Sequence, residues 1–200
     1  MDADEWNDRY RGTDLVWSAG PNMFVEQVCR DLPAGRSIDL AAGEGRNAIW
    51  LAELGWDVTA VDFSAVAVDK VRQLADRRGV TVDAQVADLT SFEPSPGEFD
   101  LVLVAYLQLI DAELTPILER AAAAVAPGGT FVLVAHDLDN LEHGHGGPSH
   151  PSVLTTPDQV VAAIAGELTI ERADVVDRPV STDDGERVAR DTLVVAHRPS

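Results

Sequence analysis

An apolar strand, a glycine-rich turn and a helix follow one another near the start of this chain. Residues 37–47 read Ser-Ile-Asp-Leu-Ala-Ala-Gly-Glu-Gly-Arg-Asn, which predicts a strand over 38–40 and a helix over 46–54. Gly43 and Gly45 let the backbone bend where a side chain would collide with a ligand. The helix start adds free N–H groups and the positive end of a dipole. This order predicts an α/β fold with a nucleotide-binding crevice.

A second strand supplies a carboxylate to the same crevice. It is expected over residues 57–61, and Asp62 follows it directly. A carboxylate at this place can accept hydrogen bonds from both hydroxyls of a ribose. Each hydrogen bond to a charged group contributes roughly 1.5 to 3 kcal/mol. An adenosine-type ligand is therefore the leading hypothesis.

The rest of the chain alternates apolar runs with helical patterns, which is typical of a parallel sheet covered on both faces. We expect a single domain over residues 1–200, built as a doubly wound, Rossmann-like, mostly parallel sheet with an antiparallel last strand and helices on both faces. The polar turn before that strand is expected at 181–186. The further strands are expected at 81–86, 99–105, 130–135, 168–176 and 191–197, and the further helices at 22–32, 64–78, 114–125 and 157–165.

Two segments lie outside this alternation. Residues 1–35 are expected to form an N-terminal helical cap. Residues 136–156 are rich in His, Gly, Pro and Asp and are longer than ordinary connections, and such loops are usually functional or disordered. We expect a substrate lid there.

Composition restricts the partners of the chain. The 34 acidic and 15 basic residues give a formal net charge of −19, which repels polyanions, although a local basic patch could still exist. No apolar run approaches the ~20 residues that cross a bilayer, and the first residues are acidic rather than basic. We expect a cytoplasmic monomer or homodimer that binds neither nucleic acid nor membrane. The single cysteine, Cys29, is expected to be a buried small side chain without chemistry.

The glycines permit two nucleotide hypotheses. Residues 43–48 fit G-x-G-x-x-A, the dinucleotide fingerprint, so an NAD(P)-dependent reductase stays an alternative. Asp39, however, lies four positions before the first of these glycines. A carboxylate facing the loop would repel a pyrophosphate, whereas it could serve the ammonium group of S-adenosylmethionine.

At these residues the chain resembles the class I S-adenosylmethionine-dependent methyltransferases. Their D-x-G-x-G-x-G motif corresponds to residues 39–45, with Ala41 in place of the first glycine. Residues 99–104 and 127–129 resemble the fourth strand of that family and the turn before the fifth. The resemblance implies S-adenosylmethionine as cofactor, with Asp62 on its ribose, Phe63 beside its adenine, and Asp88 and Leu89 at the adenine amino edge. The implied cofactor-binding residues of this core are Asp39, Ala41, Gly43, Gly45, Asn47, Asp62, Phe63, Asp88 and Leu89.

The N-terminal residues narrow the resemblance. The segment 6–10, Trp-Asn-Asp-Arg-Tyr, together with Trp17 is similar to small bacterial methyltransferases of the tellurite-resistance and thiopurine methyltransferase type. That similarity implies that Tyr10 and Trp17 close over the cofactor. The alternative is that these aromatic side chains pack an N-terminal helix on the sheet edge.

Ligands of open α/β sheets lie beyond the carboxyl ends of the strands, which places Tyr106 and His136 at the site. Methyl transfer is an in-line displacement, so the protein mainly aligns the two reactants and excludes water. We expect Tyr106 to orient the substrate and His136 to act as general base, the alternative for each being a packing role. The expected acceptor is a small molecule with an S, Se, Te, N or O nucleophile. A protein that binds the cofactor without catalysis is the remaining alternative.

Three histidines of the expected lid raise a metal hypothesis. Imidazole groups suit first-row divalent ions, and His143, His145 and His150 lie near several carboxylates in the sequence. Glycines flank His145, and no helix presents a pair at i and i+4. We therefore expect solvated loop histidines and no metal site.

Overall fold

The computed structural model describes residues 3–11 and 20–200. Its centre is a seven-stranded sheet with the strand order β3-β2-β1-β4-β5-β7-β6. The pairs β1–β2, β1–β4, β2–β3 and β4–β5 are parallel, and β7 runs antiparallel to both β5 and β6. The strands are β1 Arg36–Leu40, β2 Asp57–Asp62, β3 Asp83–Val86, β4 Phe99–Ala105, β5 Val125–His136, β6 Thr169–Thr182 and β7 Gly185–His197.

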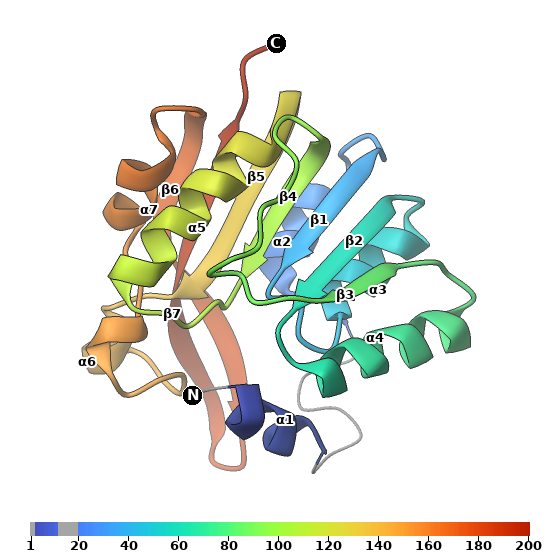
Figure 1. Cartoon of the computed structure of the whole chain (residues 1–200). Coiled ribbons are helices and arrows are strands. Elements are labelled where there is room, and N and C mark those ends of the chain that lie inside the picture. Colours follow the sequence, from blue (N-terminus) through green and yellow to red (C-terminus); the bar gives the residue numbers. More distant parts are fainter. Residues whose placement is uncertain (1–2, 12–19) are drawn as a thin grey trace.

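Helices cover both faces of this sheet, as the sequence predicts (Figure 1). On one face α5 and α7 bury apolar side chains against the strands, and on the other face α2, α3 and α4 do so. The helices are α1 Ala3–Arg11, α2 Met23–Cys29, α3 Arg46–Glu53, α4 Ala65–Arg78, α5 Asp111–Ala124, α6 Asn140–His143 and α7 Pro157–Ile164. The expected doubly wound, mostly parallel fold with an antiparallel last strand is confirmed.

The topology bears on the choice between the two nucleotide hypotheses. Dinucleotide-binding enzymes of the doubly wound type have the parallel order 3-2-1-4-5-6. Here the antiparallel β7 lies between β5 and β6. The sheet therefore departs from the dinucleotide-binding order at its far edge.

The carboxyl ends of the parallel strands meet at the lower edge of the sheet in Figure 1, where α1 also lies. The Asn7 side chain of α1 accepts a hydrogen bond from the Ser64 hydroxyl at 2.6 Å. Ser64 is the N-cap of α4, so this contact fixes α1 beside the end of β2. The cap expected at the N-terminus thus begins with a helix at the ligand-binding edge.

The hairpin of β6 and β7 is longer than the sequence indicates. The strands extend to Thr182 and from Gly185, whereas we expected them to end at 176 and to begin at 191. In Figure 1 this hairpin reaches past the other strands to the level of α1. Most residues of β6 are exposed or half-buried, so the apolar alternation that marks a strand is absent there. The strand bounds expected at 176 and 191 are therefore wrong, whereas the turn of the hairpin lies within the expected turn at 181–186.

The segment 136–156 is tied to β7 at its base. Helix α6 and a 3-10 turn at Pro151–Val153 lie within it. The hydroxyl of Thr192 donates to the buried Asp137 carboxylate at 2.6 Å, and the amide of Arg190 donates to the Asn140 side chain at 2.7 Å. The lid expected over this segment stays a prediction.

Two residues without the freedom of glycine adopt left-handed backbone conformations. Ala41 has φ of 63° and Tyr106 has φ of 57°. Such conformations cost an L-residue roughly 1 to 2 kcal/mol, and they gather at functional sites. Ala41 therefore keeps the backbone shape for which the resembling family uses glycine.

Replacing Ala41 by glycine is expected to raise the free energy of unfolding by about 1 kcal/mol, because glycine adopts the left-handed conformation without the clash. Urea denaturation followed by circular dichroism measures the change. Ala42→Gly is the control, since Ala42 has no positive φ, and it is expected to destabilise the protein. Equal destabilisation by both substitutions would contradict the strain at Ala41.

Candidate active site

A cavity lies at the carboxyl ends of β1, β2 and β4, and residues of α1 and of β6 also line it. The cavity is lined by apolar side chains and by several polar ones, as small-molecule sites generally are. Ten of the site residues expected from the sequence line it, namely Tyr10, Ala41, Gly43, Asn47, Asp62, Phe63, Asp88, Leu89, Tyr106 and His136. The fold thus brings together the predicted cofactor-binding residues and both predicted catalytic residues.

Three expected residues are not among those lining the cavity. Asp39 is fully buried behind the turn. Gly45 has φ of 80°, and a Cβ there would meet the Val71 side chain at 2.8 Å, so this glycine allows α4 to pack close to the turn. Trp17 lies outside the described residues.

Helix α1 covers the turn at Gly43. A Cβ on Gly43 would meet the Tyr10 hydroxyl oxygen at 3.1 Å. Tyr10 is buried and stacks on Trp6 with ring centroids 5.4 Å apart. The absence of a side chain at Gly43 therefore lets the Tyr10 ring lie close to the backbone of the turn, and it leaves that backbone accessible to a ligand in the cavity.

Asp62 connects the turn to the second strand. Its carboxylate accepts hydrogen bonds from the backbone amides of Gly43 at 2.8 Å and Ser64 at 2.9 Å. Burial raises the pKa of Asp62, and the two amide hydrogen bonds oppose that rise. A carboxylate has about four lone-pair positions, so it keeps acceptor capacity for a ligand. Phe63 and Leu89 provide apolar wall beside it.

Asp39 is a buried carboxylate without a hydrogen-bond partner among the described residues. Burial raises its pKa to about 7, the positive charge of Arg46 lowers it, and the charge of Asp62 raises it further. The backbone of Ala48 faces Asp39 and also lowers the pKa, yet without hydrogen-bonding geometry. Asp39 therefore acts on the cavity through its field rather than by contact.

The other end of the cavity is organised by Asp191, a buried residue of β7 that the sequence did not single out. The Tyr106 hydroxyl donates to its carboxylate at 2.6 Å, and Nε of Arg178 donates at 2.6 Å. Nδ1 of His136 lies 3.3 Å from the same carboxylate, and the rings of Tyr106 and His136 have centroids 4.7 Å apart. The Asn22 side chain also donates to the Tyr106 hydroxyl, at 3.0 Å.

These contacts determine the ionisation of Asp191. Burial alone would raise the pKa of this carboxyl. Nδ1 of His136, 3.3 Å away, and the hydrogen bonds from Arg178 and Tyr106 together outweigh burial and hold the pKa below its usual range. In turn, burial and the Asp191 charge raise the pKa of Tyr106 beyond its ordinary value. Tyr106 is therefore a neutral donor at physiological pH.

Two arginines at this end were missed from the sequence. Arg46 and Arg178 both line the cavity, and their guanidinium carbons lie 5.6 Å and 5.7 Å from the centroid of the Tyr106 ring. Arg178 lies on β6 beyond the strand end expected at residue 176. The sequence does contain a sign of the role of Arg46. A cation in the first turn of a helix interacts unfavourably with the helix dipole, and a nearby anion would offset this interaction.

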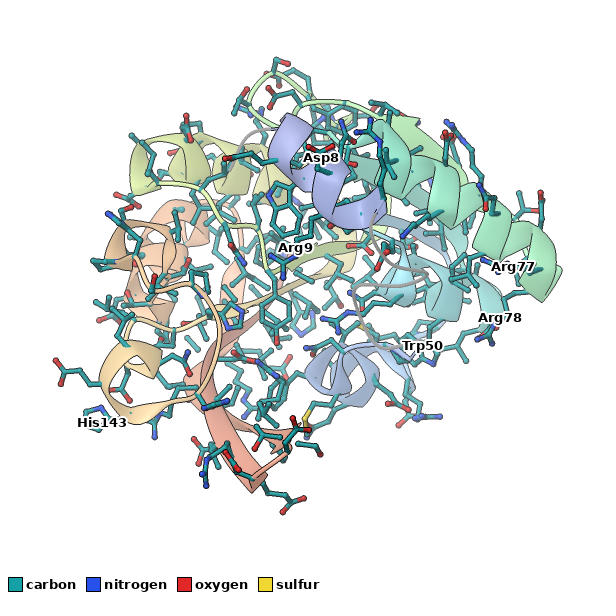
Figure 2. All side chains as sticks on the ribbon, turned by 90° about the horizontal axis from the view of Figure 1, so that it is seen from below. Asp8, Arg9, Trp50, Arg77, Arg78 and His143 are labelled. Carbon is teal, nitrogen blue, oxygen red and sulfur yellow. The ribbon has the colours of Figure 1, made fainter. Side chains whose placement is uncertain are left out.

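The side chains of the metal hypothesis lie elsewhere. His143, His145 and His150 are exposed, and Figure 2 shows His143 at the outer edge of α6, pointing away from the molecule. Among the described residues no group of three His, Cys, Asp or Glu side chains is placed to hold a metal ion. Cys29 is fully buried, and burial raises the pKa of its thiol to about 12. The expected burial of this cysteine is confirmed.

Residues 38–129 match the family model for the methyltransferase domain. The chain is 36% identical over 101 residues to the ribosomal protein L11 methyltransferase of Symbiobacterium thermophilum, a match that covers 50% of this chain and 32% of that protein. It is 28% identical over 140 residues to the 2-heptyl-1-hydroxyquinolin-4(1H)-one methyltransferase of Mycobacteroides abscessus, covering 68% of this chain and 61% of that protein. The chain thus spans less than two thirds of the length of either relative.

The fold is shared with TehB from Haemophilus influenzae, with a TM-score of 0.74 and 14% identity over 99% of this chain and 67% of that one. Among the described helices, none is long and apolar enough to cross a membrane. The matched family model covers the turn, Asp62 and β4, all of which contribute residues to the lining of the cavity. Residues 38–129 are thus similar to the methyltransferase domain, and the chain shares its fold with solved S-adenosylmethionine-dependent methyltransferases.

Proposed function

We propose that this protein transfers a methyl group from S-adenosylmethionine to a small-molecule acceptor. The observation that carries the proposal is a single cavity in which the Gly43 turn and Asp62 lie at one end and Tyr106 and His136 at the other. The similarity to the methyltransferase domain supports S-adenosylmethionine as the cofactor, and the two polar side chains at the other end support binding of an acceptor there. By their names, the two relatives act on different acceptors, a ribosomal protein and a hydroxyquinolone. The acceptor class therefore depends on features of this chain.

Two features favour a small acceptor. The aromatic pair Trp6 and Tyr10 and the segment 106–109 line the cavity, so its walls come from α1 and from the β4–α5 connection. The formal net charge of −19 opposes the approach of a nucleic acid. An acceptor that fits between these walls meets less of that long-range field than a polyanion does.

The cofactor side of the cavity fits the groups of S-adenosylmethionine. The Asp62 carboxylate suits the ribose hydroxyls, Phe63 and Leu89 suit an adenine, and Asp88 lies beside them. When bound, S-adenosylmethionine supplies a methyl group on a positively charged sulfur, ready for in-line displacement. The turn at Ala41 and Gly43 brings bare backbone to the cavity, which permits close approach of the amino acid end.

At the acceptor end the residues have separate tasks. The Tyr106 hydroxyl donates a hydrogen bond to Asp191, and the backbone of Tyr106 is left-handed. The ring is therefore held in place as a wall for the acceptor. Nδ1 of His136 faces Asp191, which leaves Nε2 as the nitrogen that can take the proton of an incoming nucleophile. A soft nucleophile that arrives ionised does not need this proton transfer. The remaining task is to align the reactants and exclude water.

Calorimetric titration with S-adenosylmethionine and S-adenosylhomocysteine tests the first half of this proposal. Absence of binding at millimolar ligand would refute it. The second half is tested by S-adenosylhomocysteine release with a panel of thiols, selenite, tellurite, amines and phenols. Tight binding of the cofactor with no release for any acceptor would favour the alternative of a cofactor-binding protein without catalysis.

Replacing Asp62 by alanine is expected to weaken S-adenosylhomocysteine binding at least tenfold, because it removes charged hydrogen bonds worth roughly 1.5 to 3 kcal/mol. The dissociation constant from calorimetry measures the loss. Asp57→Ala is the matched control, since Asp57 is an exposed carboxylate at the opposite end of the same strand. An unchanged dissociation constant for Asp62→Ala would remove this residue from the site.

A further inference from the structure

The structure points to a methyl acceptor that carries an anionic group, a carboxylate or an inorganic oxyanion, bound by Arg46 and Arg178 beside Tyr106. This inference rests on the proposed methyl transfer, and it names the chemical class of the acceptor. It reverses the simplest deduction from the net charge, which favours neutral or cationic acceptors. Three observations support it, namely the anchoring of Arg178, the position of Arg46 and the local balance of charge.

Arg178 is anchored from behind and lines the cavity in front. Its Nε donates to the Asp191 carboxylate at 2.6 Å, and its side chain is 24% exposed. A guanidinium has five N–H donors, and a rigid fork of two of them matches the spacing of two oxygens on a carboxylate or an oxyanion. The contact with Asp191 uses one donor and fixes the plane of the group. Arg178 is thus oriented before any ligand arrives.

Arg46 is a positive charge without an ion-pair partner among residues 3–11 and 20–200. No carboxylate of these residues lies at ion-pair distance from its guanidinium, which instead lies over the Tyr106 ring. Burial lowers the pKa of Arg46, which reports poor solvation of the charge. Its place in the first turn of α3 adds the unfavourable end of the helix dipole. An anion in the cavity would pair with the Arg46 guanidinium, and it would offset both the poor solvation of this charge and its unfavourable interaction with the helix dipole.

The charges around Tyr106 do not balance. Two guanidinium groups face one ionised carboxylate, Asp191, and the two arginines repel each other. Asp39 also attracts Arg46, but its pKa of about 7 leaves it only partly ionised at neutral pH. One negative charge is therefore missing from this end of the cavity. A monoanionic acceptor supplies it.

The acidic surface of the protein does not conflict with this assignment. Exposed charges are screened over about 8 Å at physiological ionic strength, so a small anion inside the cavity responds mainly to the nearest groups. A nucleic acid, by contrast, would have to lie along the outer surface. The same chain can therefore repel polyanions and bind a small anion.

Anion binding is tested on protein saturated with S-adenosylhomocysteine, so that no transfer occurs. The probes are two acids with their methyl esters, 3-mercaptopropionate and 4-hydroxybenzoate, and inorganic selenite, each titrated by calorimetry. We expect at least one acid to bind tenfold or more tightly than its ester, or selenite to bind with a measurable constant. The acids and selenite distinguish a carboxylate from an inorganic oxyanion.

Variants assign the effect to the arginines. Arg178→Lys keeps a positive charge beside Asp191 but loses the fork, and we expect it to weaken anion binding about tenfold. Arg46→Gln is expected to weaken anion binding to a similar degree while S-adenosylhomocysteine affinity stays within about threefold. Arg187→Lys, on the exposed part of β7, is the matched control and is expected to change nothing. Thermal melts confirm that each variant is folded.

The outcomes separate this inference from the proposed function. Absence of S-adenosylhomocysteine binding to the wild-type protein would overturn the proposed function and the inference together. Cofactor binding without preference for any acid over its ester, and without selenite binding, would overturn the inference alone. If Arg46→Gln weakened S-adenosylhomocysteine and spared the anion, Arg46 would belong to the carboxylate of that nucleoside, and the two-arginine site would be wrong.

Discussion

Replacing Asp191 by alanine is expected to lower the free energy of unfolding by about 3 kcal/mol. The carboxylate is completely buried, and it accepts hydrogen bonds from the Tyr106 hydroxyl and the Arg178 guanidinium. Removing one partner of a buried ion pair typically costs about 3 to 5 kcal/mol, because the other partner is left uncompensated. The lower end applies here since Arg178 is partly exposed and can turn to water.

Urea denaturation at pH 7 measures this loss, and its pH dependence checks the cause. Because the pKa of Asp191 is held below its usual range, its contribution is present above about pH 4 and is lost as pH falls through the native pKa. The wild type and Asp191→Ala should therefore converge in stability in acid. Asp174→Ala is the control, an exposed carboxylate paired with Arg172 on β6, and it should cost less than about 1 kcal/mol. Equal effects of the two substitutions would show that Asp191 is not the centre of a buried cluster.

Replacing Asp39 by asparagine is expected to have the opposite pH dependence. Burial raises the pKa of this carboxyl from 3.8 to about 7, roughly three units at ~1.4 kcal/mol each. Above about pH 4 the unfolded protein has an ionised Asp39, and on folding this carboxyl has to take up a proton or be buried with its charge. By pH 7 this requirement lowers the free energy of unfolding of the wild type by about 4 kcal/mol. This penalty is absent below about pH 4 and complete above the native pKa. The substitution removes it.

The measurement is the difference in unfolding free energy between Asp39→Asn and wild type at pH 4 and at pH 8. That difference should shift in favour of the variant by about 4 kcal/mol between the two pH values. Any cost of burying the new amide is the same at both and cancels. Asp57→Asn, at the exposed start of the same sheet's second strand, should show no such shift. A flat difference for Asp39→Asn would show that the native carboxyl is solvated or hydrogen-bonded.

The pKa values of Asp191 and Asp39 are shifted in opposite directions in the same candidate site. Asp191 has three donors around it and stabilises the fold in its charged form. Asp39 has none among the described residues and destabilises the fold when charged. Both lie close enough to Arg46 to act on its charge. The buried carboxylate of Asp39 at the end of β1 and the left-handed backbone of Ala41 just after it lie where the cofactor is proposed to bind.

Local pattern predicted residues of the turn and of the end of β2 that line the cavity. The turn at residues 41–45 and the carboxylate of Asp62 are written in consecutive residues, and the parallel strands bring them to one edge of the sheet. Tyr106 and His136 were found by the same rule, because the residue after each parallel strand lies at that edge. The roles of these residues in binding and catalysis stay proposals. The sequence did not indicate that Asp39 would lie outside the cavity wall.

The sequence by itself determined the sheet, its helices and the nucleotide turn, since these depend on apolar periodicity and glycine within short segments. Only the tertiary structure decided the acceptor end. The pairing of β7 with β5 and with β6 places Asp191 opposite His136 on one side and Val176 on the other, with Arg178 two residues further along β6. Such a cluster depends on strand register between segments far apart in the chain, and polar residues at the end of an exposed hairpin carry no periodic signal of it.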